Sequence, residues 1–388
     1  RPSFPYLMSK TPQGKISVGV FLSRGGSLEI WNSHGLLSRE LALYEALSQI
    51  GINVTLISFG RGNERSFLGL DSSLSLVHNN YGIHPRLYEW LIPILHRRRI
   101  SECTVLKTNQ ANVGRIAYQS ARMLRKPLIA RCGYLWSEFA LREHGSNSAE
   151  ARRAVSTERL LFDKACRIVV STETIKASID REYPGHSAKT SVIPNYVDTE
   201  RFSPTSGNER PHGVLFVGRI APQKNLPILL EAMRKCEQRL TIIGAGPDGA
   251  ELRNRFQGLG DRVTWVGNVP NEKLPEFMNA ARFFVLPSLY EGHPKAMLEA
   301  MACGMVTIAA DSPGIRDLLE HQITGWLCEP TADGIVQALG ELSLDTKLAD
   351  KLSENAANAI RNYFSLKRIA SRERGILEEI SVAVGARV

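Results

Sequence analysis

Short runs of β-branched and aliphatic residues alternate with longer amphipathic segments along most of the chain, and this alternation occurs twice. The pattern is typical of a parallel sheet covered by helices, because a connection between parallel strands needs a crossover helix. A chain of 388 residues is too long for one hydrophobic core and fits two domains of ordinary size. The sequence therefore predicts an α/β fold with two Rossmann-like, doubly wound parallel-sheet domains.

The first half of the chain contains a series of short segments with strand character. They lie at residues 16–23, 54–58, 74–78, 103–108, 128–132, 167–171 and 190–193. The clearest helix between them is expected at residues 33–49, where leucines and alanines recur at helical spacing and Gly51 supplies a stop signal.

The second half repeats the pattern after a polar, proline-containing stretch at residues 203–211, which we expect to be the interdomain linker. Its strand segments lie at 213–217, 240–243, 263–266, 283–286, 306–309 and 326–328. We therefore expect a first domain at residues 1–200 and a second at 201–365. The remaining residues, 366–388, include a helical segment that can cross back onto the first domain.

Composition narrows the classes of protein. With 43% hydrophobic and 22% charged residues and no biased tract, the chain is typical of a globular enzyme. The longest apolar stretches fall far short of the roughly 20 residues that cross a bilayer, and the first residues lack the apolar core of a signal peptide. We therefore expect a cytoplasmic protein. The 6 cysteines form no C-x-x-C pair, so neither disulfides nor zinc are expected.

The net charge of +9 favours an anionic partner, such as a nucleotide, a phosphate, nucleic acid or an acidic lipid surface. No element typical of nucleic-acid recognition is present, so we expect no nucleic-acid partner.

Two carboxylates with a specific spacing stand in the segment PSLYEGHPKAMLEAMACG, residues 287–304. Pro294 suits the first turn of a helix, which places Glu291 in the preceding loop and Glu299 more than a turn inside the helix. The free N–H groups at the start of that helix suit a phosphate. Because carboxylate oxygens accept hydrogen bonds from adjacent hydroxyls, this turn predicts a site for a sugar linked to a diphosphate.

Two further loops follow strands of the second half. Arg219 and Lys224 follow the first strand, at the carboxyl edge where open α/β sheets bind ligands, and can neutralise a departing diphosphate. Gly244 and Gly246 follow the next strand and allow close approach of the backbone to a ligand, although a plain turn accounts for them equally well.

The stretches VGRIAPQKN, IIGAGPDGAEL, VTWVGNV and YEGHPKAMLEAMACGMVTIAADSPGIRDLL together resemble the family 4 retaining glycosyltransferases, whose GT-B architecture has two Rossmann-like domains facing a cleft. The resemblance is strong at residues 191–326, recognisable at 24–58 and nearly absent between 60 and 185. It implies transfer of a sugar from a UDP- or GDP-sugar to a hydroxyl acceptor, with retention of configuration. It also implies an acceptor-side first domain and a nucleotide-sugar-binding second domain. No cofactor and no metal are expected, and the chain contains no Asp-x-Asp pair.

The resemblance also implies a role for each motif residue. Arg219 and Lys224 would bind the donor phosphates, and Glu291 would face the transferred sugar, which makes these three the catalytic candidates. Glu299 would bind the ribose hydroxyls. The remaining donor-binding candidates are Gly25, Gly26, Gly218, Gly244, Asn268, Val269, Gly292, His293, Pro294, Lys295 and Ala296. Of these, Gly25 and Gly26 would close over the diphosphate from the first domain, and Asn268 and Val269 would lie beside the base.

The chain departs from the family at two positions. Many relatives carry a sugar-facing histidine where this chain reads ARCGYLW, which leaves Arg131, Tyr134 and the later His144 as candidates for that role. Tyr196 replaces the usual glycine before the linker, either as a packing substitution or as a residue that stiffens the hinge.

The acceptor stays open between a carbohydrate, a lipid-linked and a small-molecule substrate. Residues 88–99, YEWLIPILHRRR, form either a core-packing helix with a basic end or a peripheral contact with the anionic inner face of a membrane. Two alternatives to transfer also stay open. One is a GT-B sugar-nucleotide epimerase, and the other is a catalytically silent partner that binds a nucleotide sugar.

Overall fold

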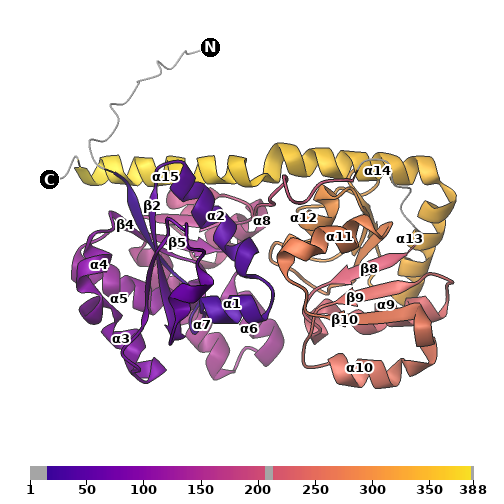
Figure 1. The fold of residues 1–388 in the computed structure, drawn as a ribbon, viewed down its shortest axis with the longest axis horizontal. Coiled ribbons are helices and arrows are strands. Elements are labelled where there is room, and N and C mark those ends of the chain that lie inside the picture. The colour runs from indigo at the N-terminus through magenta and orange to yellow at the C-terminus, as the bar shows by residue number, and fades with distance from the viewer. Residues whose placement is uncertain (1–14, 206–212, 386–388) are drawn as a thin grey trace, which may run out of the picture.

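Two parallel sheets, one in each half of the chain, form the framework of the protein (Figure 1). The computed structural model describes residues 15–205 and 213–385, so most of the predicted linker lies outside the described residues. The first sheet has 7 strands in the order β3-β2-β1-β4-β5-β6-β7, and the second has 6 in the order β10-β9-β8-β11-β12-β13. These orders confirm the predicted α/β fold with two doubly wound parallel sheets.

The strands of the first sheet are β1 (Ser17–Phe21), β2 (Asn53–Arg61), β3 (Ser75–Asn79), β4 (Val105–Thr108), β5 (Leu128–Cys132), β6 (Arg167–Val170) and β7 (Thr190–Val192). Those of the second are β8 (Val214–Val217), β9 (Leu240–Ile243), β10 (Val263–Gly267), β11 (Phe283–Leu286), β12 (Val306–Ala310) and β13 (Trp326–Cys328). Every predicted strand segment overlaps one of these strands. The central strands are almost wholly buried, because helices cover both faces of each sheet.

The helices that cover the first sheet are α1 (Leu28–Ser33), α2 (Leu37–Gln49), α3 (Pro85–Leu95), α4 (Arg97–Ser101), α5 (Gly114–Leu124), α6 (Trp136–His144), α7 (Ala149–Lys164) and α8 (Glu173–Glu182). The helices in the second half of the chain are α9 (Leu226–Arg234), α10 (Gly249–Arg255), α11 (Leu274–Asn279), α12 (Lys295–Ala302), α13 (Ala332–Leu344), α14 (Thr346–Ala359) and α15 (Leu366–Gly385).

The helix predicted at residues 33–49 begins later than expected. Two helices occupy this region, α1 ending at Ser33 and α2 beginning at Leu37, with a turn between them. Gly35 in this turn has φ +70°, a left-handed conformation that interrupts an α-helix and that glycine adopts without steric cost. The periodic leucines therefore continue across a break that the hydrophobic pattern alone does not reveal.

Helix α15 leaves the second domain and packs along the first, as the yellow helix in Figure 1 shows. Its residues Ile369, Ile376, Leu377 and Ile380 belong to the same buried cluster as α2 and β1. A buried ion pair joins Lys107 of β4 to Glu373 of α15, with 2.5 Å between Nζ and Oε2. Helix α15 is thus part of the first domain's core.

The segment at residues 88–99 has both buried and exposed apolar side chains. Tyr88 and Ile92 of α3 are fully buried, which fits a packing helix. Leu87, Trp90 and Ile94 on the same helix are more than half exposed, and Trp90 reaches 65%. Within the described residues, no helix has the length and apolar character needed to cross a bilayer.

The Lys107–Glu373 pair predicts a stability effect. In Glu373→Gln, the Lys107 ammonium stays buried without a counter-ion, so we expect the free energy of unfolding to fall by about 3–5 kcal/mol. Glu379→Gln on the same helix is the matched control, because Glu379 is 62% exposed and its pair with Arg167 should contribute less than about 1 kcal/mol. Urea unfolding of the three proteins tests this, and equal losses in both variants would contradict it.

Candidate active site

A cavity of about 880 Å³ lies between the carboxyl edges of the two sheets. Loops from both domains line it, together with Ile369 and Glu373 of α15. Most of the predicted donor-binding residues line this one cavity: Gly218, Arg219, Lys224, Gly244, Asn268, Val269, Glu291, Gly292, His293, Pro294, Lys295 and Ala296. The structure therefore brings together motifs that are up to 78 positions apart in the sequence, from Gly218 to Ala296.

Lys224 and Glu291 form an ion pair in the cavity wall, with 2.5 Å between Nζ and Oε1. Their side chains are only 16% and 7% exposed. The loops that carry them are joined through Gln223, whose side chain donates to the carbonyl of Tyr290 and whose carbonyl accepts from the N–H of Leu289. The loop after β8 and the loop after β11 thus hold a cation and a carboxylate in a defined position.

The glycines after β9 are required by the neighbouring loop. A Cβ on Gly244 would lie 2.0 Å from the carbonyl oxygen of Gly218, and one on Gly246 would lie 2.0 Å from that of Ile220. Both distances are too short for any side chain, so the loops after β8 and β9 can pack together only with glycine at these positions. The sequence suggested that these glycines allow the backbone to approach a ligand closely. In the structure, they allow close approach to the backbone of the neighbouring loop at the rim of the cavity.

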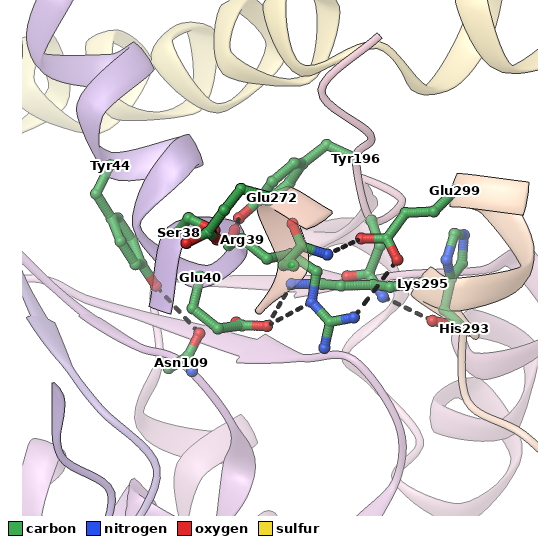
Figure 2. Close-up of polar contacts among 12 residues, drawn as sticks. Ser38, Arg39, Glu40, Tyr44, Asn109, Tyr196, Glu272, His293, Lys295 and Glu299 are labelled. Carbon is green, nitrogen blue, oxygen red and sulfur yellow. Dashed lines mark hydrogen bonds and ion pairs between the residues drawn. The ribbon is translucent and has the colours of Figure 1, made fainter. Parts of the chain in front are cut away.

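Glu299 is buried behind the cavity wall, with 2% of its side chain exposed, and is not among the lining residues (Figure 2). Its Oε1 accepts a hydrogen bond from Nδ2 of Asn271 at 3.0 Å, and its Oε2 lies 3.7 Å from the Arg39 guanidinium. That Oε2 has no hydrogen-bond partner within the described residues. Burial raises the pKa of Glu299, and Arg39 offsets part of this effect.

Arg39 and Glu40 of α2 reach across to the second domain, and neither was predicted as a site residue. Glu40 Oε1 accepts from Nζ of Lys295 at 2.9 Å and lies 3.4 Å from Nε of Arg39 (Figure 2). Burial alone would raise the pKa of Glu40, but the two cations outweigh it and hold this pKa below its usual value. Glu40 is therefore ionised at neutral pH and links the two domains.

Tyr196, which stands where relatives carry glycine, packs into the same group. Its hydroxyl donates to the carbonyl of Arg39 at 2.6 Å, and the Lys295 ammonium lies 4.9 Å from the centre of its ring. The tyrosine thereby supports both sides of the interdomain contact. This arrangement agrees with a packing role for the substitution.

Gly25 and Gly26 are not among the residues that line the cavity. The N–H of Gly26 donates to the carbonyl of Ser23, and its own carbonyl accepts from Phe59, so this turn is folded on the first domain. Gly35, and not this turn, contacts the second domain. A Cβ on Gly35 would lie 2.4 Å from the carbonyl oxygen of Val269, and the carbonyl of Gly35 accepts from the N–H of Asn271 at 2.8 Å.

Among the candidates for the sugar-facing position, Arg131 and Tyr134 line the cavity, whereas His144 is exposed at the end of α6 and is not part of the lining. His293 is buried, and neither of its ring nitrogens has a hydrogen-bond partner within the described residues. Burial, with the nearby charges of Arg131 and Lys295, lowers the pKa of His293 to about 3. Its ring is therefore neutral.

Comparison with known proteins identifies the family of this chain. Residues 198–359 match the family described as glycosyl transferases group 1, and residues 41–201 match glycosyltransferase family 4. The chain belongs to the group 1, family 4 glycosyltransferases.

Individual relatives are more distant. The amylovoran biosynthesis glycosyltransferase of Erwinia amylovora is 34% identical over 164 residues, which cover 39% of this chain and 38% of that protein. Sucrose-phosphate synthase from Thermosynechococcus elongatus has a similar fold, with a TM-score of 0.79, 21% identity, and coverage of 95% of this chain and 100% of the other. HepE of Anabaena, crystallised with UDP-glucose, gives a TM-score of 0.74 at 18% identity over 93% and 99% of the two chains. At these identities, the structural likeness establishes the fold.

The contact between Gly35 and Val269 predicts the effect of a substitution. Ala at position 35 must adopt a left-handed conformation, which costs about 1–2 kcal/mol, and its Cβ must also push the second domain away. Gly51→Ala is the matched control, because Gly51 has φ +89° but open space around it. We expect Gly35→Ala to lower the thermal midpoint more than the control does, and to raise the radius of gyration in small-angle scattering. Identical behaviour of the two variants would contradict this account.

Proposed function

We propose that this chain is a retaining glycosyltransferase, which moves a sugar from a UDP- or GDP-sugar to a hydroxyl acceptor. The observation that carries the proposal is the Lys224–Glu291 pair, which faces the interdomain cavity beside Arg219. A cation for a leaving phosphate and a carboxylate for sugar hydroxyls are thus held side by side. The UDP-glucose bound to HepE, which shares this fold, supports a nucleotide-sugar donor.

The donor diphosphate is expected at Arg219, Lys224 and the start of α12. The Lys224 ammonium has three N–H donors, of which Glu291 occupies one, so donors are left for a phosphate oxygen. The N–H groups of Lys295 and Ala296 begin α12 and add the positive end of its dipole. Such preorganised donors stabilise negative charge on the leaving group, and we propose that they do so without a metal.

Glu299 and the loop after β10 are proposed to hold the nucleoside. Glu299 Oε2 is a buried acceptor without a hydrogen-bond partner within the described residues, which suits a ribose hydroxyl that enters between Glu299 and Arg39. Asn268 and Val269 line the cavity, and we propose that they lie beside the base.

In the proposed reaction, the bond between the anomeric carbon and the diphosphate oxygen lengthens, and positive charge develops on the sugar ring. Arg219 and Lys224 stabilise the departing diphosphate, which takes the bonding electron pair. The acceptor hydroxyl attacks from the same face and gives its proton to the leaving phosphate, so the anomeric configuration is retained. Glu291 holds hydroxyls of the transferred sugar, and no enzyme nucleophile is assigned.

Two alternatives use the same cavity. A sugar-nucleotide epimerase would release an altered sugar, and a silent partner would bind the nucleotide sugar without turnover. The Lys224–Glu291 pair favours transfer over a silent partner. Partial burial of these two charges costs desolvation free energy, which structural packing alone would not require.

Nucleotide release tests the proposal. The purified protein is incubated with UDP-, GDP- and ADP-sugars without acceptor, since transferases of this kind usually lose sugar slowly to water. We expect hydrolysis of one donor and about a 100- to 1000-fold slower rate in Lys224→Ala and Glu291→Gln. Lys235→Ala removes a half-exposed lysine paired with Asp333 on the same domain and should change the rate less than twofold. A protein that neither binds nor hydrolyses any donor would refute the proposal, and an altered sugar still joined to its nucleotide would indicate the epimerase.

We also propose a peripheral contact with an anionic membrane on its cytoplasmic side. Leu87, Trp90 and Ile94 form an exposed apolar stripe on α3, directly before the basic residues of α4. This combination suits insertion at the lipid headgroup level, with the arginines attracted to acidic lipids.

Vesicle sedimentation tests the membrane contact. At low salt, we expect the protein to sediment with vesicles of phosphatidylglycerol and phosphatidylcholine. Reversal of Arg97, Arg98 and Arg99 to Glu should weaken binding by on the order of 100-fold, since each cation near the surface contributes about 1 kcal/mol. Reversal of three exposed cations on the other domain, Lys347, Lys351 and Arg361, is the control. Equal losses from both reversals would show only an effect of net charge.

A further inference from the structure

Arg131 stands at the carboxyl end of β5 and lines the cavity from the first domain. Its backbone is held by Thr108 of the neighbouring strand, whose hydroxyl accepts from the N–H of Arg131 at 2.9 Å. Its side chain is held by the carbonyl of Ile193 and the amide oxygen of Asn195, at 2.8 and 3.1 Å. The guanidinium is therefore positioned before any ligand arrives.

The loop that carries Glu291 lies close to Arg131. Asn195 accepts from Arg131 and donates through Nδ2 to the carbonyl of His293 at 2.8 Å, so one side chain connects the two. The segment after Arg131 also packs on this loop, because a Cβ on Gly292 would lie 2.7 Å from Cβ of Tyr134. Arg131 thus lines the cavity from the first domain and is linked through Asn195 to the loop of Glu291, the residue proposed to hold the transferred sugar.

The charge environment of Arg131 differs from that of the lysines in the cavity. Lys107 is paired with Glu373, Lys224 with Glu291, and Lys295 with Glu40. Both acceptors of Arg131 within the described residues are neutral. A guanidinium has five N–H donors in a planar fork and does not lose its proton, so Arg131 keeps free donors and an unbalanced positive charge.

We propose that Arg131 determines substrate specificity by binding the carboxylate of a uronic acid, either on the transferred sugar or on the acceptor; this inference rests on the proposed glycosyltransferase function. A single unbalanced guanidinium matches the charge of a carboxylate, whereas a phosphate monoester carries up to two negative charges. The planar fork also fits a carboxylate through two parallel hydrogen bonds. Asn109 and Gln110, which line the same wall, supply neutral amide groups for the sugar hydroxyls.

The donor arm of the test compares hydrolysis of UDP-glucuronate and UDP-galacturonate with that of UDP-glucose and UDP-galactose. If the carboxylate belongs to the donor, the wild type has the higher kcat/KM for the acidic sugars. In Arg131→Gln, the acidic-to-neutral ratio of kcat/KM then falls by about 10- to 100-fold, which corresponds to one charge-assisted hydrogen-bonded contact. Arg122→Gln removes an exposed arginine of α5 in the same domain and should leave the ratio unchanged.

The acceptor arm uses the best neutral donor and adds methyl glycosides of galacturonate or glucuronate, with the corresponding neutral hexosides as controls. If the carboxylate belongs to the acceptor, the acidic glycosides change the rate of UDP release at lower concentration than the neutral ones. Arg131→Gln removes this difference, and Arg122→Gln keeps it. A lower rate for both acidic and neutral ligands in Arg131→Gln, with their ratio kept, would assign Arg131 only to holding Asn195 and the Glu291 loop.

The outcomes separate this inference from the proposed function. Turnover of neutral donors with no preference for an acidic ligand in either arm would overturn the role of Arg131 and leave the transferase intact. Absence of hydrolysis and of binding for every donor would overturn both. A preference that Arg131→Gln removes in one arm supports the inference, and the arm in which it occurs shows which substrate carries the carboxylate.

Discussion

In both sheets the strands run parallel, and this brings every loop that leaves a carboxyl end to one edge of its sheet. The two edges face each other, so that short loops from distant parts of the chain meet, as Gly35 does with Val269 and Tyr134 with Gly292. The site therefore depends on how one sheet is placed against the other. Helix α15 contributes to that placement, because it leaves the second domain and buries its apolar residues in the core of the first.

The polar contacts between the domains are of a kind that a ligand can change. The Glu40–Lys295 pair remains 19% and 16% exposed at the cavity, and Arg39 lies 3.7 Å from Glu299 without a hydrogen bond between them. These side chains are mostly buried, so the attraction within each pair is offset by the cost of removing its charges from water, and the net contribution is modest. They link the two domains in the arrangement that the structure shows. A ligand that offers Glu299 or Arg39 a better partner would compete with these contacts between the domains.

The strands could be predicted from the sequence because each is marked by a short run of apolar residues within its own segment. The start of α12 could be predicted because Pro294 favours the beginning of a helix. The local pattern of the sequence was insufficient for the break at Gly35, where the leucine pattern continues through a residue with positive φ. Nor did it reveal Arg39 and Glu40. These are ordinary charged residues on an amphipathic helix, and only their placement against Lys295 and Glu299 of the other domain gives them a role.

The second domain was easier to interpret from sequence than the first, for a chemical reason. The proposed diphosphate and ribose are common to many nucleotide sugars, and the cations and carboxylates proposed to bind them stand in recognisable motifs after β8 and β11. On the first domain, the cavity is lined by the ends of strands, such as Asn109 and Gln110 after β4 and Arg131 at the end of β5. These residues stand in segments whose other side chains are selected for burial in the sheet, so each is a single polar position without a surrounding pattern. The first-domain wall is the part of the site expected to distinguish one acceptor from another. On this wall, the chemistry is indicated only by the three-dimensional arrangement and by the charge left unpaired on Arg131.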